Sequence, residues 1–85
     1  MIHSPGYLRK KVRELLAMAP GYYMTDPMII EKVNLMIEPD APAGDIRAGV
    51  EWNVAKGYAE TRVNEDTDER EWCITKRGIA KESVK

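Results

Sequence analysis

The spacing of hydrophobic residues predicts a helix near the start of the chain. Leucine, valine and alanine recur three or four positions apart from Leu8 to Ala19, as they do on the buried face of a helix. Ser4 supplies a capping side chain just before this run, and Pro5 suits the first helical turn because its missing N–H is not needed there. The sequence Pro20-Gly21 predicts the end of the helix.

A second helix is predicted after a short extended segment at residues 22–24. Thr25 or Asp26 can cap it, and its apolar residues recur at helical spacing as far as Ile37. The helix ends before Pro39, since a proline disfavours helical geometry at the residue that precedes it.

A third helix is predicted from residue 41 or 42 to Lys56, again from apolar residues at helical spacing. Gly44 and Gly49 oppose this assignment, because each glycine destabilises a helix interior by about 1 kcal/mol relative to alanine. Gly57 directly follows and suits the left-handed turn that ends many helices.

Alternating residues further along the chain predict a two-stranded β-hairpin. Residues 59–63 alternate between small or apolar and charged side chains, which predicts a half-buried strand with Thr61 and Val63 facing inward. Residues 64–69 are wholly polar and suit an exposed turn. Residues 71–75 are then predicted to return as the second strand.

Together these elements predict the α+β fold class, with three helices, a short strand between the first two, and a C-terminal two-stranded hairpin. A single domain is expected to span residues 1–85, since a chain of 85 residues has room for one compact core. Residues 1–6 and 80–85 are expected to be mobile ends, and the chain from Lys76 onward is expected to be a short tail.

The order of these elements resembles the winged helix-turn-helix superfamily, in which the hairpin is called the wing. Ala55-Lys56-Gly57-Tyr58-Ala59 is similar to the lysine-glycine sequence that begins the family's wing. Ile74-Thr75-Lys76-Arg77-Gly78 is similar to the aliphatic-threonine-x-x-glycine sequence that ends it. The resemblance covers roughly residues 8–80. It implies binding of double-stranded DNA, with the third helix in the major groove and the wing at the backbone or minor groove.

The resemblance also places candidate DNA contacts on the third helix and around the hairpin. Arg47 can donate two hydrogen bonds to a guanine edge, or it can pair with a nearby carboxylate such as Glu51, four residues further on. Both interpretations stay open at this point. The candidate DNA-binding residues are Ala43, Arg47, Arg62, Arg70 and Lys76.

The charge distribution departs from that of a typical DNA-binding domain. The formal net charge is -1, whereas dedicated nucleic-acid-binding domains are more often clearly basic. Basic residues gather at 8–16 and 76–85, although the basic side of the first helix favours a solvated surface over a phosphate contact. The turn of the hairpin carries a dense acidic cluster where the resemblance implies basic residues: Glu65, Asp66, Asp68 and Glu69.

The sequence offers little for catalysis or for metal binding. His3 is the only histidine and Cys73 the only cysteine, which disfavours a nucleophile with a histidine base, a zinc site and an internal disulfide. The chain is therefore not predicted to be an enzyme, and no cofactor or metal site is expected. No apolar run approaches the roughly 20 residues that cross a bilayer, and the first six residues lack the features of a signal peptide. A cytoplasmic protein without membrane contact is expected.

Two functions remain after these considerations. The first is a small DNA-binding protein, such as a transcription regulator or a phage- or plasmid-type accessory protein. A homodimer would suit it, because a single module of this size buries little DNA surface. The second is a protein-protein interaction module inside a larger assembly. In that case the acidic wing and the small residues Ala43, Gly44 and Ala48 would meet another protein.

Overall fold

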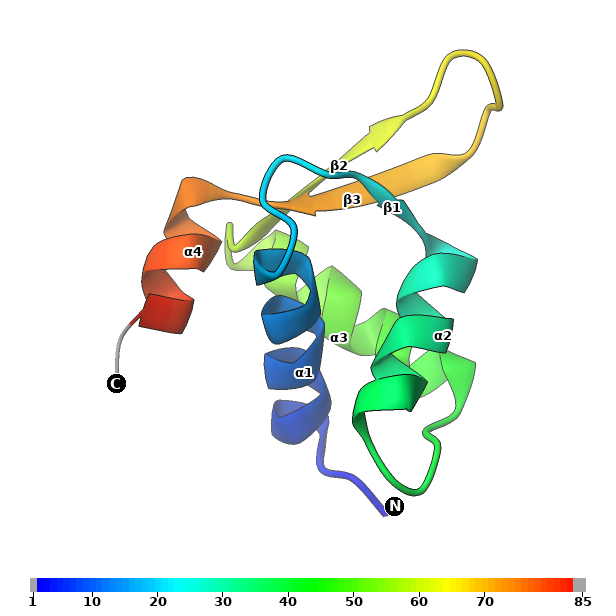
Figure 1. Cartoon of the computed structure of the whole chain (residues 1–85), viewed down its shortest axis with the longest axis vertical. Coiled ribbons are helices and arrows are strands. Elements are labelled where there is room, and N and C mark those ends of the chain that lie inside the picture. The colour runs from blue at the N-terminus through cyan, green and yellow to red at the C-terminus, as the bar shows by residue number, and fades with distance from the viewer. Residues whose placement is uncertain (1, 84–85) are drawn as a thin grey trace.

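The computed structural model describes residues 2–83, which form four helices and a three-stranded antiparallel sheet (Figure 1). The predicted α+β class is confirmed, including the short strand between the first two helices and the hairpin after the third. The elements are α1 (Pro5–Ala17), β1 (Met24–Thr25), α2 (Asp26–Met36), α3 (Ala43–Ala55), β2 (Ala59–Val63), β3 (Arg70–Ile74) and α4 (Lys76–Ser83).

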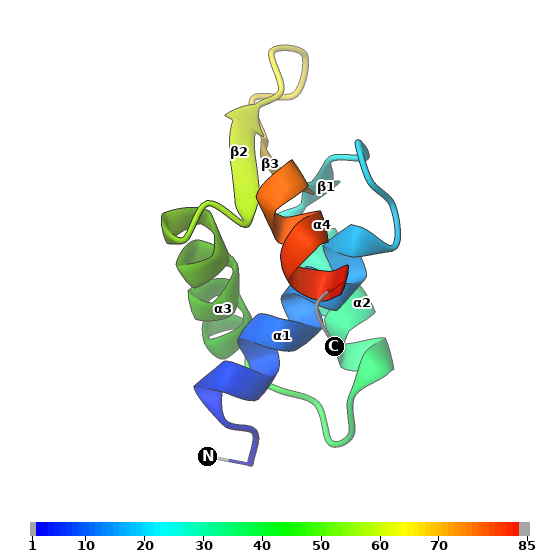
Figure 2. The same cartoon turned by 90° about the vertical axis from the view of Figure 1, so that its left-hand side faces the viewer.

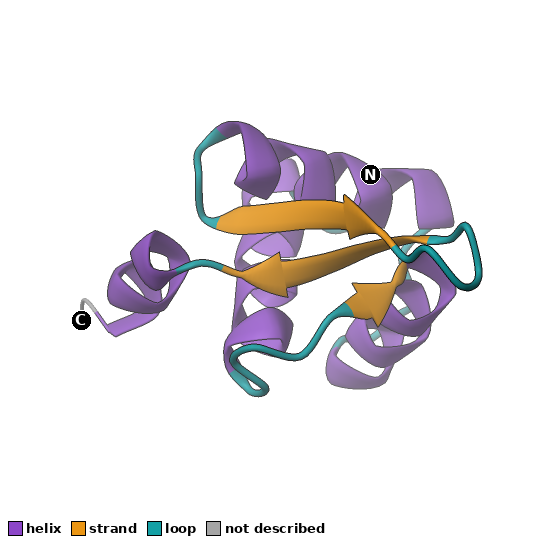
Figure 3. Cartoon of the chain, turned by 90° about the horizontal axis from the view of Figure 1, so that it is seen from above, coloured by secondary structure: helices purple, strands orange, loops and turns teal. Residues whose placement is uncertain are grey.

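The first three helices pack together beneath the sheet, whose other face is open to solvent (Figures 1 and 3). Their apolar stripes meet in one core, as the helical spacing in the sequence predicted. The side chains with 2% exposure or less in this core are Leu8, Val12, Leu16, Ile29, Val33, Ile46 and Val50.

The helix ends follow the capping residues in the sequence. The Ser4 side chain caps α1 by accepting a 3.1 Å hydrogen bond from the Tyr7 amide. At the end of α3, Gly57 adopts the left-handed conformation with φ of 79°. The amide of Tyr58 then bonds the Asn53 carbonyl at 2.8 Å, which closes the helix as in a Schellman motif.

The sheet has the order β1-β3-β2, and its central strand β3 pairs with both neighbours. In β2 only Ala59 is buried. Thr61 and Val63 lie on the same face of the strand as Ala59, as the alternation predicted, but both are exposed. The outer part of the hairpin projects beyond the helices (Figure 1). Alternation predicts a strand, but burial also needs a layer of structure underneath.

A fourth helix replaces the short tail that was predicted from Lys76 onward. The hydroxyl of Thr75 accepts a 3.0 Å hydrogen bond from the Gly78 amide, which caps the start of α4. The helix packs against α1 (Figure 2). Of the ends expected to be mobile, residues 5–6 lie in α1 and 80–83 in α4, while residues 1 and 84–85 lie outside the described residues.

The two glycines inside α3 have different surroundings. Gly49 faces α1, and an added Cβ would lie 3.4 Å from the backbone nitrogen of Arg9, so this glycine permits a close crossing of the two helices. An added Cβ at Gly44 would meet nothing within 4 Å.

Over residues 2–83, none of the helices is both long enough and apolar enough to cross a membrane.

Because an added Cβ at Gly44 would meet nothing within 4 Å, replacing Gly44 with alanine is expected to stabilise the protein by about 0.5–1 kcal/mol. Alanine restricts the unfolded chain and meets no obstacle in the folded one. Urea denaturation followed by tryptophan fluorescence would measure the change. A destabilised variant would mean that the start of α3 is more crowded than described.

Candidate nucleic-acid interface

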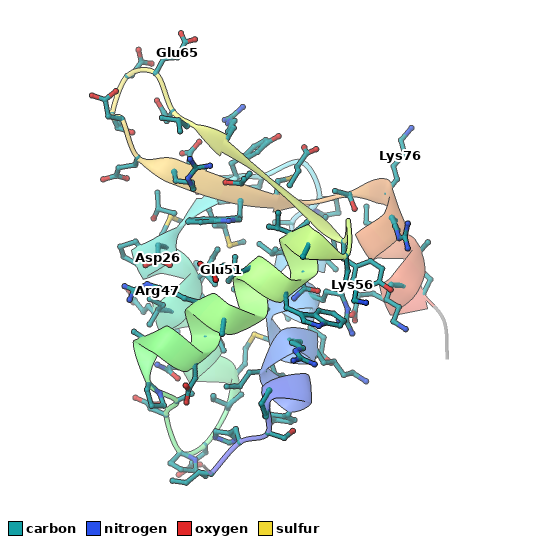
Figure 4. All side chains as sticks on the ribbon, turned by 180° about the vertical axis from the view of Figure 1, so that it is seen from behind. Asp26, Arg47, Glu51, Lys56, Glu65 and Lys76 are labelled. Carbon is teal, nitrogen blue, oxygen red and sulfur yellow. The ribbon has the colours of Figure 1, made fainter. Side chains whose placement is uncertain are left out.

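The outer face of α3 is the first candidate surface for nucleic acid. Its inner face, with Ile46 and Val50, packs into the core. The opposite face is exposed along its whole length and can be followed in Figure 4 from Arg47 through Glu51 toward Lys56. We define the outer stripe of α3 as the exposed residues Gly44, Arg47, Ala48, Glu51 and Ala55.

The outer stripe presents mostly small side chains. Gly44, Ala48 and Ala55 leave the helix backbone accessible, so another surface can approach it closely. Ala43, a predicted contact, is the first residue of α3 and is half-buried. The charged members of the stripe, Arg47 and Glu51, have opposite signs, so the stripe itself is close to neutral.

Arg47 pairs with Asp26, at the start of α2, and not with Glu51 (Figure 4). Its Nε donates a 2.7 Å hydrogen bond to Asp26 Oδ2, and 54% of the Arg47 side chain remains exposed. Among residues 2–83, no group accepts a hydrogen bond from the two terminal nitrogens of this guanidinium. The carboxylate thus orients the arginine while its outer edge stays open to solvent.

A cleft of about 270 Å³ lies beside this pair, between α2, α3 and β3. Val50 and Trp72 supply its apolar lining, and Asp26, Arg47 and Glu51 supply its charges. Two carboxylates and one guanidinium make the cleft slightly negative, which does not suit a phosphate group.

Arg62 and Arg70, the two predicted contacts on the hairpin, lie on opposite faces of it, because Arg62 is opposite Glu71 and Arg70 is opposite Val63 in the strand register. The Arg62 guanidinium lies 3.7 Å from the centre of the Tyr23 ring and donates to Glu71 at 3.2 Å. Its charge is therefore already engaged within the sheet. Arg70 is exposed and donates a weak 3.4 Å hydrogen bond to the Thr61 hydroxyl.

Tyr23 extends this group of contacts on the open face of the sheet. Its hydroxyl donates a 2.6 Å hydrogen bond to the carboxylate of Glu60. This hydrogen bond raises the pKa of Tyr23 above its ordinary value, because ionisation would set two negative charges against each other. The open face of the sheet is thus covered by mutually paired charges.

The turn of the hairpin is acidic and lies at the far end of the molecule from α4 (Figure 4). The side chain of Asn64 shapes the turn by accepting hydrogen bonds from the amides of Asp66 at 2.8 Å and Thr67 at 3.3 Å. Within residues 2–83, no lysine or arginine forms an ion pair with the acidic residues of this turn. We call Glu65, Asp66, Asp68 and Glu69 the acidic tip.

The five predicted contacts do not form one surface. Ala43 and Arg47 lie on α3, Arg62 and Arg70 on the hairpin, and Lys76 at the exposed start of α4 (Figure 4). The acidic tip adjoins the hairpin pair, so a phosphate would be repelled there. Arg47 is the predicted residue whose exposure and orientation best fit a contact to a base edge.

Groups suited to metal binding do not come together among residues 2–83. Cys73 is buried in β3, and the His3 ring forms a 2.6 Å hydrogen bond with the Pro39 carbonyl. No cluster of three or more histidine, cysteine, aspartate or glutamate side chains among residues 2–83 could hold a metal ion.

Comparisons with known proteins leave the family open. The chain matches no family model, no curated protein and no solved structure. What the protein does must therefore be inferred from its own residues.

Proposed function

We propose that this protein binds double-stranded DNA through the outer stripe of α3, as a member of the winged helix-turn-helix superfamily. The observation that carries the proposal is the pairing of Arg47 with Asp26. It uses only Nε of the guanidinium, so the terminal nitrogens have no hydrogen-bond partner among residues 2–83, and 54% of the side chain is exposed.

An arginine arranged in this way suits a guanine base. The two terminal nitrogens can donate to guanine O6 and N7, which are neighbouring acceptors in the major groove. Asp26 already restricts the guanidinium, so less conformational entropy is lost when the base is bound.

The small residues of the outer stripe support the same proposal. The major groove of B-form DNA is about 12 Å wide and accepts one α-helix. Alanine and glycine at positions 44, 48 and 55 let the backbone of α3 approach the base edges closely. The acidic tip lies at the end of the hairpin, where the family resemblance implies a basic wing, so the hairpin is not expected to hold phosphates.

The test is whether Arg47 discriminates between DNA sequences. Duplexes selected by the protein from a randomised pool would be compared with scrambled duplexes by fluorescence anisotropy. We expect Arg47→Ala to lower the affinity for selected duplexes by roughly 5- to 100-fold, the range for one bidentate contact to a base, with little effect on scrambled ones. Asp26→Ala is expected to reduce the ratio of the two affinities by about threefold, because the guanidinium loses its orientation.

Lys32→Ala provides a matched control, since Lys32 is an exposed cation on α2 without an ion pair among the described residues. This variant should keep the full ratio of affinities. An Arg47→Ala variant that discriminates as well as the wild type would contradict the proposed role of α3.

A protein-protein interaction module is the second candidate, and the acidic tip favours it. Four carboxylates without cationic partners among residues 2–83 suit a basic protein surface. The same titration separates the two candidates. If the wild type binds no duplex even at low salt, the DNA proposal is rejected and this second candidate takes its place.

A further inference from the structure

Positively charged side chains gather on the side of the molecule formed by α1, the end of α3 and α4. Within residues 2–83, no carboxylate oxygen lies within 4.0 Å of any of these cations. All but Arg9, which is half-buried, are exposed. We call this set, Arg9, Lys10, Lys56, Arg77 and Lys81, the basic face.

Two aromatic rings organise one half of the basic face. The guanidinium of Arg9 lies 4.7 Å from the centre of the Trp52 ring, and Nζ of Lys56 lies 5.5 Å from it. The guanidinium of Arg77 lies 5.6 Å from the centre of the Tyr58 ring. The two rings are 6.0 Å apart, so these three cations form one continuous group.

The other half continues across α1 and α4. Lys10 and Lys81 line a pocket of about 240 Å³ together with Arg13 and Glu82. Arg13 joins the two halves, because its guanidinium is also 5.4 Å from the Tyr58 ring. It adds little free charge, since it is buried and paired with Glu82 at 2.8 Å.

The acidic residues on these helices do not neutralise the basic face. Glu14 pairs with Lys11 at 3.0 Å and Glu82 pairs with Arg13, so both carboxylates are already engaged. On α3, Glu51 lines the cleft beside Arg47, and Asp45, in the first turn, lines a separate pocket near the start of the chain. A chain with a net charge of -1 therefore carries five unpaired positive charges on one side and the acidic tip on another.

We infer that the basic face binds the phosphate backbone of nucleic acid. This inference rests on the proposed function, which names nucleic acid as the partner, and adds where the backbone is held. Lys56 caps the C-terminal end of α3, so the basic face begins where the outer stripe ends (Figure 4). A duplex lying along α3 thus meets unpaired cations at that end of the helix, and acidic residues along the hairpin.

The experiment compares single charge reversals on and off the basic face, with a mixed-sequence duplex as the probe. Affinity would be measured by anisotropy at about 50 mM and about 200 mM salt. Lys56→Glu and Lys81→Glu are each expected to weaken binding to every duplex about 5- to 10-fold and to reduce the salt slope by about 1, as for a lost phosphate contact. Lys32→Glu on α2 changes the net charge equally and should stay within about twofold of the wild type.

The failure of this inference is distinct from that of the proposed function. If Lys56→Glu and Lys81→Glu bind like Lys32→Glu, the basic face is not a phosphate site, whether or not Arg47 discriminates between sequences. If they weaken binding while Arg47→Ala discriminates normally, the basic face is supported and base contacts by α3 are rejected.

Apart from nucleic acid, the acidic tip of a second copy of the chain is a partner whose charge is opposite to that of the basic face. Sedimentation at low salt would detect it as self-association. Association that Lys56→Glu abolishes, in a protein that binds no duplex, would overturn the inference. A wild-type protein that is monomeric at low salt and binds the duplex would support it.

Discussion

Replacing Gly78 with alanine is expected to lower the free energy of unfolding by about 2–3 kcal/mol, in spite of the higher helix propensity of alanine. Gly78 is buried where α4 contacts the start of the hairpin. An added Cβ would overlap the carbonyl oxygen of Tyr58 and would lie 2.7 Å from Cγ1 of Ile74. Because backbone atoms cannot move aside as a flexible side chain can, α4 would have to shift away from the hairpin.

Urea denaturation would measure this loss, and Gly6→Ala provides the matched control. An added Cβ at Gly6, also in a helix, would meet nothing within 4 Å, so this variant should not be destabilised. Since domains are usually stable by only about 5–15 kcal/mol, the loss at Gly78 should shift the midpoint clearly. An unchanged midpoint for Gly78→Ala would show that α4 does not dock in the described way.

Replacing Asn53 with alanine is expected to cost about 2–4 kcal/mol of stability. Asn53 is fully buried in α3, and its amide nitrogen donates to the carbonyls of Arg9 at 3.0 Å and Gly49 at 2.8 Å. Its amide oxygen accepts a 3.3 Å hydrogen bond from Arg13, whose Nε bonds Glu82. Truncation would leave part of this network, which joins α1, α3 and α4, without partners.

The same denaturation experiment would include Glu51→Ala as the control. Glu51 is exposed on the same helix, so its replacement should change stability by less than about 0.5 kcal/mol. If Asn53→Ala and Glu51→Ala were equally stable, the buried hydrogen bonds of Asn53 would not contribute to folding.

Most of the fold could be predicted because local signals and tertiary packing agree. The caps at Ser4 and Gly57 lie where helices begin and end, and the apolar stripes of α1, α2 and α3 meet in one core. The fourth helix was missed for a physical reason. It has 8 residues, and Gly78 is its only buried residue, so it lacks an apolar stripe.

A signal for α4 was nevertheless present in the sequence. Thr75 and Gly78 were noted as the end of a wing, whereas together they form a helix cap and a close backbone contact. Recognising the threonine as a capping residue would have predicted a helix at Lys76. Its docking depends on the distant Tyr58 and Arg13, which no local pattern in the sequence could reveal.

The candidate site was less predictable, since it depends on pairs that are far apart in the chain. Glu51 was the local partner considered for Arg47, but the actual partner, Asp26, is 21 residues away. The basic side of α1 was predicted to be a solvated surface. The structure places it beside Lys56, Arg77 and Lys81, with which it forms the basic face.

At the base of the hairpin, Thr75 joins the end of β3 to the residues that precede β2. The Thr75 hydroxyl donates to the Gly57 carbonyl at 2.6 Å, and its amide donates to the Tyr58 carbonyl at 3.1 Å. The two strands are therefore held together where they leave the helical body, whereas the residues at the far end of the hairpin are exposed. The charges of the side chains there and the length of the turn can change without repacking the interior, so this end of the hairpin can be adapted to a new partner.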